Sequence, residues 1–210
     1  MSFKQKIRLL LVDDHLVVRM GLAFMMNSQE DMSVIAEAAT GAEALALFNG
    51  LNPDVVLMDL KLPDMSGIEC TALLRKVQPE ARVIILTTYG GDENIYRALQ
   101  AGARTYLLKD MSGEEILSAV RAVAAGQTCL PPSIAARLAA RMPDSDLSSR
   151  EITILRSIAQ GLSNKEIGSS LNITESTVKG HVNHLLSKLK ARDRTEAVTM
   201  ALRRGLISLD

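Results

Sequence analysis

Short runs of apolar residues alternate with longer amphipathic segments over the first 125 residues. An unbroken apolar run is typical of a parallel strand that is covered on both faces. The longer segments repeat their apolar residues at the spacing of a helix. The pattern predicts strands at residues 7–12, 33–38, 54–58, 82–86 and 105–108, and helices at residues 16–26, 41–48, 68–77, 92–100 and 112–125.

Five strands that alternate with five helices indicate an α/β fold built on a doubly wound parallel sheet. In such sheets, ligands bind beyond the carboxyl ends of the strands. Polar side chains follow four of the predicted strands. They are Asp13 and Asp14 after the first strand, Asp59 after the third, Thr87 after the fourth and Lys109 after the fifth. We therefore expect these five side chains to converge at one edge of the sheet.

Asp59 follows four consecutive apolar residues, and its chemistry depends on its neighbours. A single aspartate after a strand is more often a cap for the next loop than a reactive group. Three carboxylates at one edge, however, repel one another unless a cation joins them. Mg²⁺ fits because it prefers oxygen ligands, and a lysine with a hydroxyl opposite the metal suits a phosphoryl group. We therefore interpret Asp59 as a nucleophile that forms an aspartyl phosphate.

Five motifs resemble the receiver domain of two-component response regulators over about residues 7–125. They are Val12-Asp13-Asp14, Leu57-Met58-Asp59-Leu60, Leu62-Pro63-Asp64-Met65-Ser66-Gly67, Leu86-Thr87 and Tyr106-Leu107-Leu108-Lys109. The resemblance implies a flavodoxin-like sheet with the strand order 2-1-3-4-5. It also implies that the phosphohistidine of a sensor histidine kinase phosphorylates Asp59.

The same resemblance implies roles for the residues around Asp59. The phosphoryl oxygens are held by Thr87 and Lys109, and Tyr106 turns inward on activation. The ligands of Mg²⁺ are Asp13 (mainly through water), Asp14, Asp59 and the backbone carbonyl of Lys61.

Lys61 and Tyr89 lie two residues beyond Asp59 and Thr87, at positions that control the access of water in receivers. Neither residue has a carboxylate or an amide that would orient an attacking water. We therefore predict slow self-dephosphorylation, with a half-life well beyond seconds.

Residues 126–146 have the composition of a linker, because prolines and polar residues punctuate both ends. The alanine-rich stretch 134–141 favours a short helix. Residues 1–128 hold 12 Lys or Arg and 16 Asp or Glu, whereas residues 129–210 hold 12 and 8. A basic second half indicates nucleic acid as its partner. We predict a receiver domain at residues 1–125, this linker, and a DNA-binding domain at residues 147–210.

The second half contains repeated helix-start signals. Ser148 with Glu151, and Ser163 with Glu166, form capping boxes, and Thr174 is the expected N-cap of a third helix. We predict an all-α domain of four helices. Two of these helices are short and joined by a tight turn, which indicates a helix-turn-helix. The predicted helices span residues 147–159, 163–171, 174–190 and 195–204.

The helix at residues 174–190 has two contrasting faces. The apolar stripe, which must pack in a core, consists of Val178, Val182, Leu185 and Leu189. The opposite face is small and polar, which allows close entry into the major groove. It carries Ser176, Gly180, Asn183 and Ser187, with Lys179 and Lys190 beside them. A glycine inside a helix costs about 1 kcal/mol relative to alanine. Gly180 is therefore either a point where DNA approaches closely or a tolerated, exposed glycine.

A second set of motifs resembles the LuxR-type helix-turn-helix. It comprises Ser148-x-x-Glu151, Gly161-Leu162-Ser163-Asn164-Lys165-Glu166-Ile167, Thr177-Val178-Lys179-x-His181-Val182 and Arg194-Thr195-x-Ala197-Val198. Together with the receiver motifs, the chain resembles the NarL/FixJ family over nearly its full length. The resemblance implies that Lys179, Gly180 and Asn183 face bases, and that Lys165 and Thr174 contact phosphates.

These observations predict a DNA-binding transcription factor that phosphorylation of Asp59 activates. Its expected partners are a sensor histidine kinase, double-stranded DNA, a second copy of the chain and, as a further candidate, RNA polymerase. No apolar run approaches the roughly 18 residues of a membrane span. The two cysteines are too few for a disulfide framework. We therefore expect a cytoplasmic protein without a membrane partner.

Two other classes of protein use similar residues. An aspartyl-phosphate phosphatase needs a second carboxylate two residues after its nucleophile, where this chain has Lys61. An orphan regulator that never receives phosphate should have lost a member of the site, yet all five are present. We therefore expect a regulator and not an enzyme.

Overall fold

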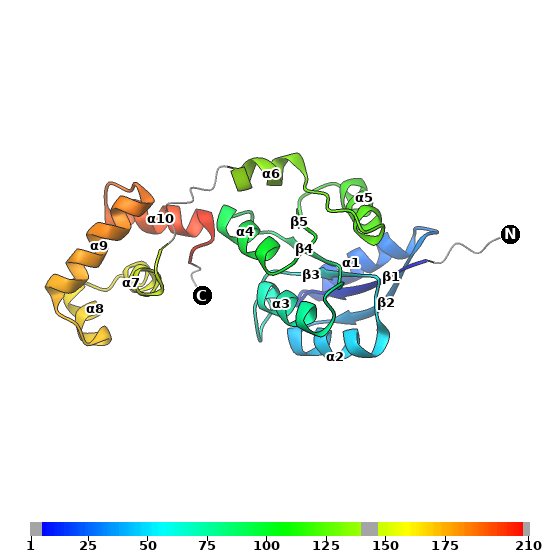
Figure 1. Cartoon of the computed structure of the whole chain (residues 1–210), viewed down its shortest axis with the longest axis horizontal. Helices are drawn as coiled ribbons and strands as arrows, with labels where there is room; N and C mark the ends of the chain where they lie inside the picture. Colours follow the sequence, from blue (N-terminus) through cyan, green and yellow to red (C-terminus); the bar gives the residue numbers. More distant parts are fainter. Residues whose placement is uncertain (1–5, 140–146, 208–210) are drawn as a thin grey trace. The chain divides into compact units, whose positions relative to one another are not determined.

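The computed structural model describes residues 6–139 and 147–207, which fold as two units (Figure 1). The first unit contains a five-stranded sheet in which every neighbouring pair of strands is parallel. Its order, β2-β1-β3-β4-β5, confirms the predicted topology. The strands are β1 (Ile7–Val12), β2 (Met32–Ala38), β3 (Val55–Met58), β4 (Val83–Thr87) and β5 (Thr105–Leu108).

Helices alternate with these strands as predicted. They are α1 (Leu16–Asn27), α2 (Gly41–Leu51), α3 (Gly67–Val77), α4 (Asp92–Gln100) and α5 (Gly113–Ala124), followed by α6 (Pro132–Ala139). Helix α2 is three residues longer than the prediction and ends where Asn52 takes a left-handed conformation, with φ 46°. The apolar pattern ends earlier because Asn49 and Gly50 carry no apolar signal. The predicted linker helix at 134–141 begins at Pro132, and its last two residues lie outside the described part of the chain.

The strands are buried on both faces, which explains their unbroken apolar runs. All residues of β3, β4 and β5 are buried. Side chains of alternate strand positions, such as Leu11, Leu57 and Leu86, form one core with buried residues of α1 and α5. Full burial of one such side chain stabilises the fold by about 1.5–3 kcal/mol.

The second unit is helical and contains α7 (Ser149–Ala159), α8 (Asn164–Leu171), α9 (Glu175–Leu189) and α10 (Arg194–Arg204). Both predicted capping boxes are present, at the starts of α7 and α8. The hydroxyl of Thr174 accepts a hydrogen bond from the backbone N–H of Thr177, so Thr174 is the N-cap of α9. The turn between α8 and α9 is tight: a Cβ on Gly168 would lie 2.8 Å from the carbonyl oxygen of Ile173.

The apolar stripe of α9 packs into the core of this unit as predicted. Val178, Leu185 and Leu189 are buried, and Val182 is partly buried against the same core. The domain limits at residues 125 and 146 stay predictions, since residues 140–146 lie outside the described ranges.

Candidate functional site

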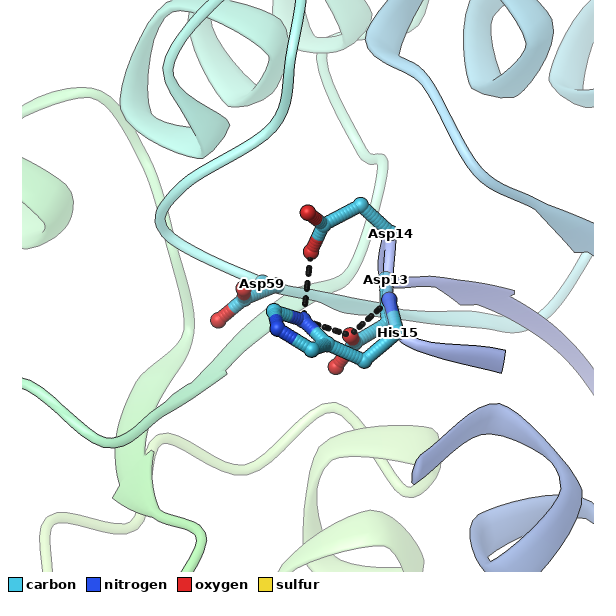
Figure 2. Close-up of side chains that lie close together, drawn as sticks. All are labelled: Asp13, Asp14, His15 and Asp59. Carbon is cyan, nitrogen blue, oxygen red and sulfur yellow. Dashed lines mark hydrogen bonds and ion pairs between the residues drawn. The ribbon is translucent and has the colours of Figure 1, made fainter. Parts of the chain in front are cut away.

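Three carboxylates meet at the carboxyl edge of the sheet (Figure 2). In the ladder of β1 with β3, Val12 lies opposite Met58, so the residues after each strand also lie side by side. The backbone N–H of Asp59 donates to the Val12 carbonyl at 2.8 Å. Asp13 and Asp59 are buried, whereas Asp14 is exposed. One carboxylate oxygen from each aspartate and one ring nitrogen of His15 all lie within 4.8 Å of one another.

Lys109 arrives at this cluster from the end of β5. Its Nζ lies 2.5 Å from Oδ2 of Asp13 and 3.3 Å from Oδ1 of Asp59. Its backbone N–H donates to the Thr87 carbonyl at 2.8 Å, which holds the ends of β4 and β5 together. Thr87 itself is fully buried. The structure thus brings together the five residues that were expected to converge, while their chemical roles stay predictions.

The cluster is suited to a divalent cation. Burial raises the pKa of Asp59, the ammonium of Lys109 lowers it and the carboxylate of Asp13 raises it, and the resulting pKa lies above the usual value. Apart from its ion pair with Lys109, Oδ1 of Asp59 has no hydrogen-bond partner among the described residues. A buried carboxylate oxygen in this state, beside two further carboxylates, fits a hard cation with oxygen ligands.

Two residues that the sequence analysis missed surround the aspartate pair. Nδ1 of His15 lies 2.7 Å from Oδ1 of Asp14, and the backbone N–H of His15 donates to Oδ1 of Asp13 at 3.0 Å. The guanidinium of Arg19 donates to the backbone carbonyl of Asp13 at 2.5 Å. Their signal in the sequence was weak: His15 directly follows the pair, and Arg19 lies one helical turn later.

The loop after β4 connects Thr87 with Tyr106. The backbone N–H of Tyr89 donates to Oγ1 of Thr87 at 3.4 Å, and the buried Tyr106 hydroxyl donates to the Tyr89 carbonyl at 2.5 Å. Tyr106 therefore points inward in this structure. Nζ of Lys61 lies 4.7 Å from the centroid of the Tyr89 ring, a cation–π contact. The predicted role of the Lys61 carbonyl as a metal ligand stays untested.

The residues predicted to bind DNA are all exposed on the second unit. They are Lys165, Thr174, Ser176, Lys179, Gly180 and Asn183. Lys165 and Thr174 line one shallow groove between α8 and α9. A Cβ on Gly180 would meet no atom within 4 Å among the described residues. The fold of the unit therefore does not require glycine at position 180.

Comparison with known families identifies the chain. Residues 9–121 match the model of the response regulator receiver domain, and residues 145–201 match that of the luxR family of bacterial regulatory proteins. The chain belongs to the two-component response regulators. With a receiver and a luxR-family domain in one chain, it is a response regulator of the transcription-factor type and not an enzyme, so the phosphatase alternative is wrong.

Individual relatives support this family assignment. The chain is 42% identical over 206 residues to the response regulator protein VraR of Staphylococcus aureus, and the match covers 96% of this chain and 99% of VraR. It is 41% identical to ChrA, the response regulator of a heme-sensing two-component system, with a TM-score of 0.59, covering 96% of this chain and 99% of that chain. A structure of two RcsB dimers bound to DNA has the same fold, at 21% identity and a TM-score of 0.71, covering 95% and 99% of the two chains.

No helix within the described parts of the response regulator has both the length and the apolar character needed to cross a membrane.

Proposed function

We propose that the response regulator accepts a phosphoryl group on Asp59 from the phosphohistidine of a sensor histidine kinase, and then binds double-stranded DNA as a homodimer. The observation that carries this proposal is the environment of the Asp59 carboxylate. It is buried, its Oδ1 is 3.3 Å from the Lys109 ammonium, and that oxygen accepts no hydrogen bond from the described residues. A cationic group on one side and two carboxylates on the other suit phosphoryl transfer.

The reaction requires little of the protein beyond position and charge. An oxygen of Asp59 attacks the phosphorus, the P–N bond breaks, and its electron pair leaves with the kinase imidazole. Lys109, which now contacts Asp13 at 2.5 Å, would turn to a phosphoryl oxygen, and the Thr87 hydroxyl would bind another. Mg²⁺, when bound, supplies positive charge beside the phosphoryl oxygens. Its ligands would be Asp13, Asp14, Asp59 and the Lys61 carbonyl.

Phosphorylation would change the conformation of the loop after β4. Tyr89 contacts Thr87 through its N–H and Tyr106 through its carbonyl. A Thr87 hydroxyl that turns to the phosphoryl group releases the first of these contacts, and so biases the loop between two packings. This chain of contacts supports the roles of Thr87 and Tyr106 as switch residues.

The second unit would bind DNA through α9 as a member of a symmetric pair. The exposed polar face of α9 supports base contacts by Lys179 and Asn183, and the groove at Lys165 and Thr174 supports phosphate contacts. In the structure of RcsB, that protein is bound to DNA as a dimer. We place the regulator in the cytoplasm, where it would contact the kinase and, as a further candidate, RNA polymerase.

One experiment tests the proposal as a whole. Wild type and Asp59→Asn are compared for DNA binding, with and without acetyl phosphate and Mg²⁺, by fluorescence anisotropy on a duplex selected from a random pool. The phosphodonor should tighten wild-type binding at least tenfold and leave Asp59→Asn unchanged. Equal binding in all four conditions would show instead an orphan regulator that binds DNA constitutively.

A further inference from the structure

The imidazole of His15 lies amid the carboxylates of the acidic edge, which Asp13, Asp14 and Asp59 form (Figure 2). His15 is the N-cap of α1, but its side chain makes no capping hydrogen bond. Serine, threonine, aspartate and asparagine are preferred at an N-cap, because their side-chain oxygen accepts from the backbone of the helix. Nδ1 of His15 lies instead 2.7 Å from Oδ1 of Asp14 and 3.4 Å from Oδ1 of Asp13. The ring is thus directed to the acidic edge and not to its own helix.

Neither packing nor stability accounts for this placement of the ring. The side chain of His15 is 68% exposed, so little of it is buried against the fold. The side chain of Asp14 is 38% exposed, and exposed ion pairs contribute little to stability because water screens them. The backbone of His15, by contrast, is held on both sides: its N–H donates to Oδ1 of Asp13 at 3.0 Å, and its carbonyl accepts from the N–H of Arg19 at 3.1 Å. A fixed backbone that carries an exposed ring beside carboxylates suits a metal ligand.

Together the four side chains offer a set of donors for one ion. One carboxylate oxygen from each aspartate and one ring nitrogen of His15 lie within 4.8 Å of one another. Donors on opposite sides of a divalent ion are about 4.2 Å apart, since each bond is about 2.1 Å long. Rotation of the exposed side chains of Asp14 and His15 closes the difference. Asp59 independently indicates a ligand, because its buried Oδ1 has no partner among the described residues apart from the Lys109 ammonium.

A ring nitrogen changes which ion this set of donors prefers. Mg²⁺ is a hard cation that takes oxygen ligands and keeps several waters. Imidazole favours divalent transition-metal ions, whose affinity for nitrogen and oxygen ligands rises from Mn²⁺ through Co²⁺ to Ni²⁺ and Cu²⁺. Carboxylates alone suit Mg²⁺, whereas carboxylates with an imidazole suit an ion of the second kind.

We propose that His15 is a fourth ligand at the acidic edge, and that it makes the site prefer a divalent transition-metal ion to Mg²⁺. Mg²⁺ would bind the carboxylates without the ring. The consequence of this preference rests on the proposed function, because the ion concerned is the one that serves the phosphorylation of Asp59. His15 would determine which metal ion supports that reaction at low concentration.

Replacing His15 with asparagine distinguishes a ligand from a merely structural residue. Asparagine is a preferred N-cap, so His15→Asn should fold, which circular dichroism checks. Its amide nitrogen takes nearly the place of Nδ1 and keeps a donor for Asp14, but an amide nitrogen has no lone pair for a metal ion as an imidazole nitrogen does. His184→Asn is the matched control, because His184 is an exposed histidine on α9 of the other unit.

Isothermal titration calorimetry on the full chain at pH 8 measures the binding of Mg²⁺ and Co²⁺, two ions of nearly equal size. His15→Asn should raise the dissociation constant for Co²⁺ at least about tenfold and change that for Mg²⁺ by less than about twofold. His184→Asn should bind both ions as wild type does.

Proton NMR of the Co²⁺ complex identifies the ligand directly. The unpaired electrons of Co²⁺ shift the ring C–H signals of a bound histidine far outside their usual range. Wild type and His184→Asn should show these shifted signals, and His15→Asn should not.

Four results would overturn the inference. His15→Asn binds Co²⁺ as wild type does, or it loses affinity for Mg²⁺ and Co²⁺ equally, so that the ring acts only through charge or shape. Wild type shows no shifted signals, or His184→Asn alone loses them, so that the bound histidine lies on α9. Phosphorylation by acetyl phosphate, measured on phosphate-affinity gels, separates the two proposals. If wild type is not phosphorylated on Asp59 with either ion, the proposed function fails, while the Co²⁺ titrations and spectra still decide whether His15 is a ligand.

Discussion

Replacing Lys109 with methionine tests whether the acidic edge of the sheet is a cation site. Methionine keeps an apolar chain of similar length and removes one positive charge. That charge now lies 2.5 Å from Asp13 and 3.3 Å from Asp59, where it competes with any bound cation for the same carboxylates. We therefore expect Lys109→Met to bind Mg²⁺ more tightly than wild type, even though it should respond poorly to phosphorylation.

The magnitude follows from Coulomb's law. Two unit charges about 4 Å apart interact by about 1 kcal/mol in water and by about 4 kcal/mol at the effective dielectric constant of a protein surface. The Lys109 side chain is 15% exposed, so part of this interaction is screened. A gain of about 1.4–2.8 kcal/mol corresponds to roughly 10- to 100-fold tighter binding of Mg²⁺.

Isothermal titration calorimetry with Mg²⁺ at pH 8 measures this change. The high pH matters because loss of the Lys109 ammonium, which lowers the pKa of Asp59, would raise that pKa further and let protons compete with the cation. Lys76→Met, an exposed lysine of α3, controls for net charge and should leave the affinity unchanged. Unchanged or weaker binding by Lys109→Met would mean that Mg²⁺ does not use these carboxylates.

Three further predictions concern other parts of the chain. The aspartyl phosphate should decay with a half-life well beyond seconds, and Tyr89→Glu, which puts a carboxylate beside Lys61, should shorten it several-fold; loss of radiolabel within seconds from wild type contradicts this. Lys179→Ala should weaken DNA binding and, if Lys179 contacts phosphate, reduce the salt slope by about one; unchanged affinity and sequence preference would place Lys179 outside the interface. Glu151→Ala removes a buried capping carboxylate and its 2.7 Å contact with Lys188. It should lower the free energy of unfolding by about 2–4 kcal/mol, as measured by hydrogen exchange of α7 peptides. Burial raises the pKa of Glu151, but hydrogen bonds, led by that of Lys188, lower this pKa overall. The stability that Glu151 contributes should therefore be present above its unfolded pKa and lost as the pH falls through its folded pKa. Equal hydrogen-exchange protection in the variant and wild type would refute this prediction.

The convergence of the acidic edge could be predicted because it depends on chain direction alone. When neighbouring strands are parallel, their carboxyl ends meet, so residues directly after β1, β3, β4 and β5 must share one edge. Asp13, Asp59 and Lys109 were placed correctly in this way. The motif resemblance supplied the strand order, which the alternation of strands and helices leaves open.

Other features depend on contacts that no local pattern encodes. The Tyr106 hydroxyl reaches the Tyr89 carbonyl because β5 lies beside β4 and the loop that follows it. The spacing of Tyr89 and Tyr106 in the sequence does not reveal this contact.

The sequence by itself determined the class of the fold, the capping of the helices in the DNA-binding unit and the family of the protein. These features follow from apolar periodicity and from short motifs whose physics is local. Only the tertiary structure decided which side of α1 is covered, because apolar residues lie on nearly every side of that helix and their pattern indicates no single buried face. It also decided that Lys109 contacts Asp13 (2.5 Å) more closely than Asp59 (3.3 Å), because that choice depends on a difference of less than one ångström between groups that are far apart in the sequence.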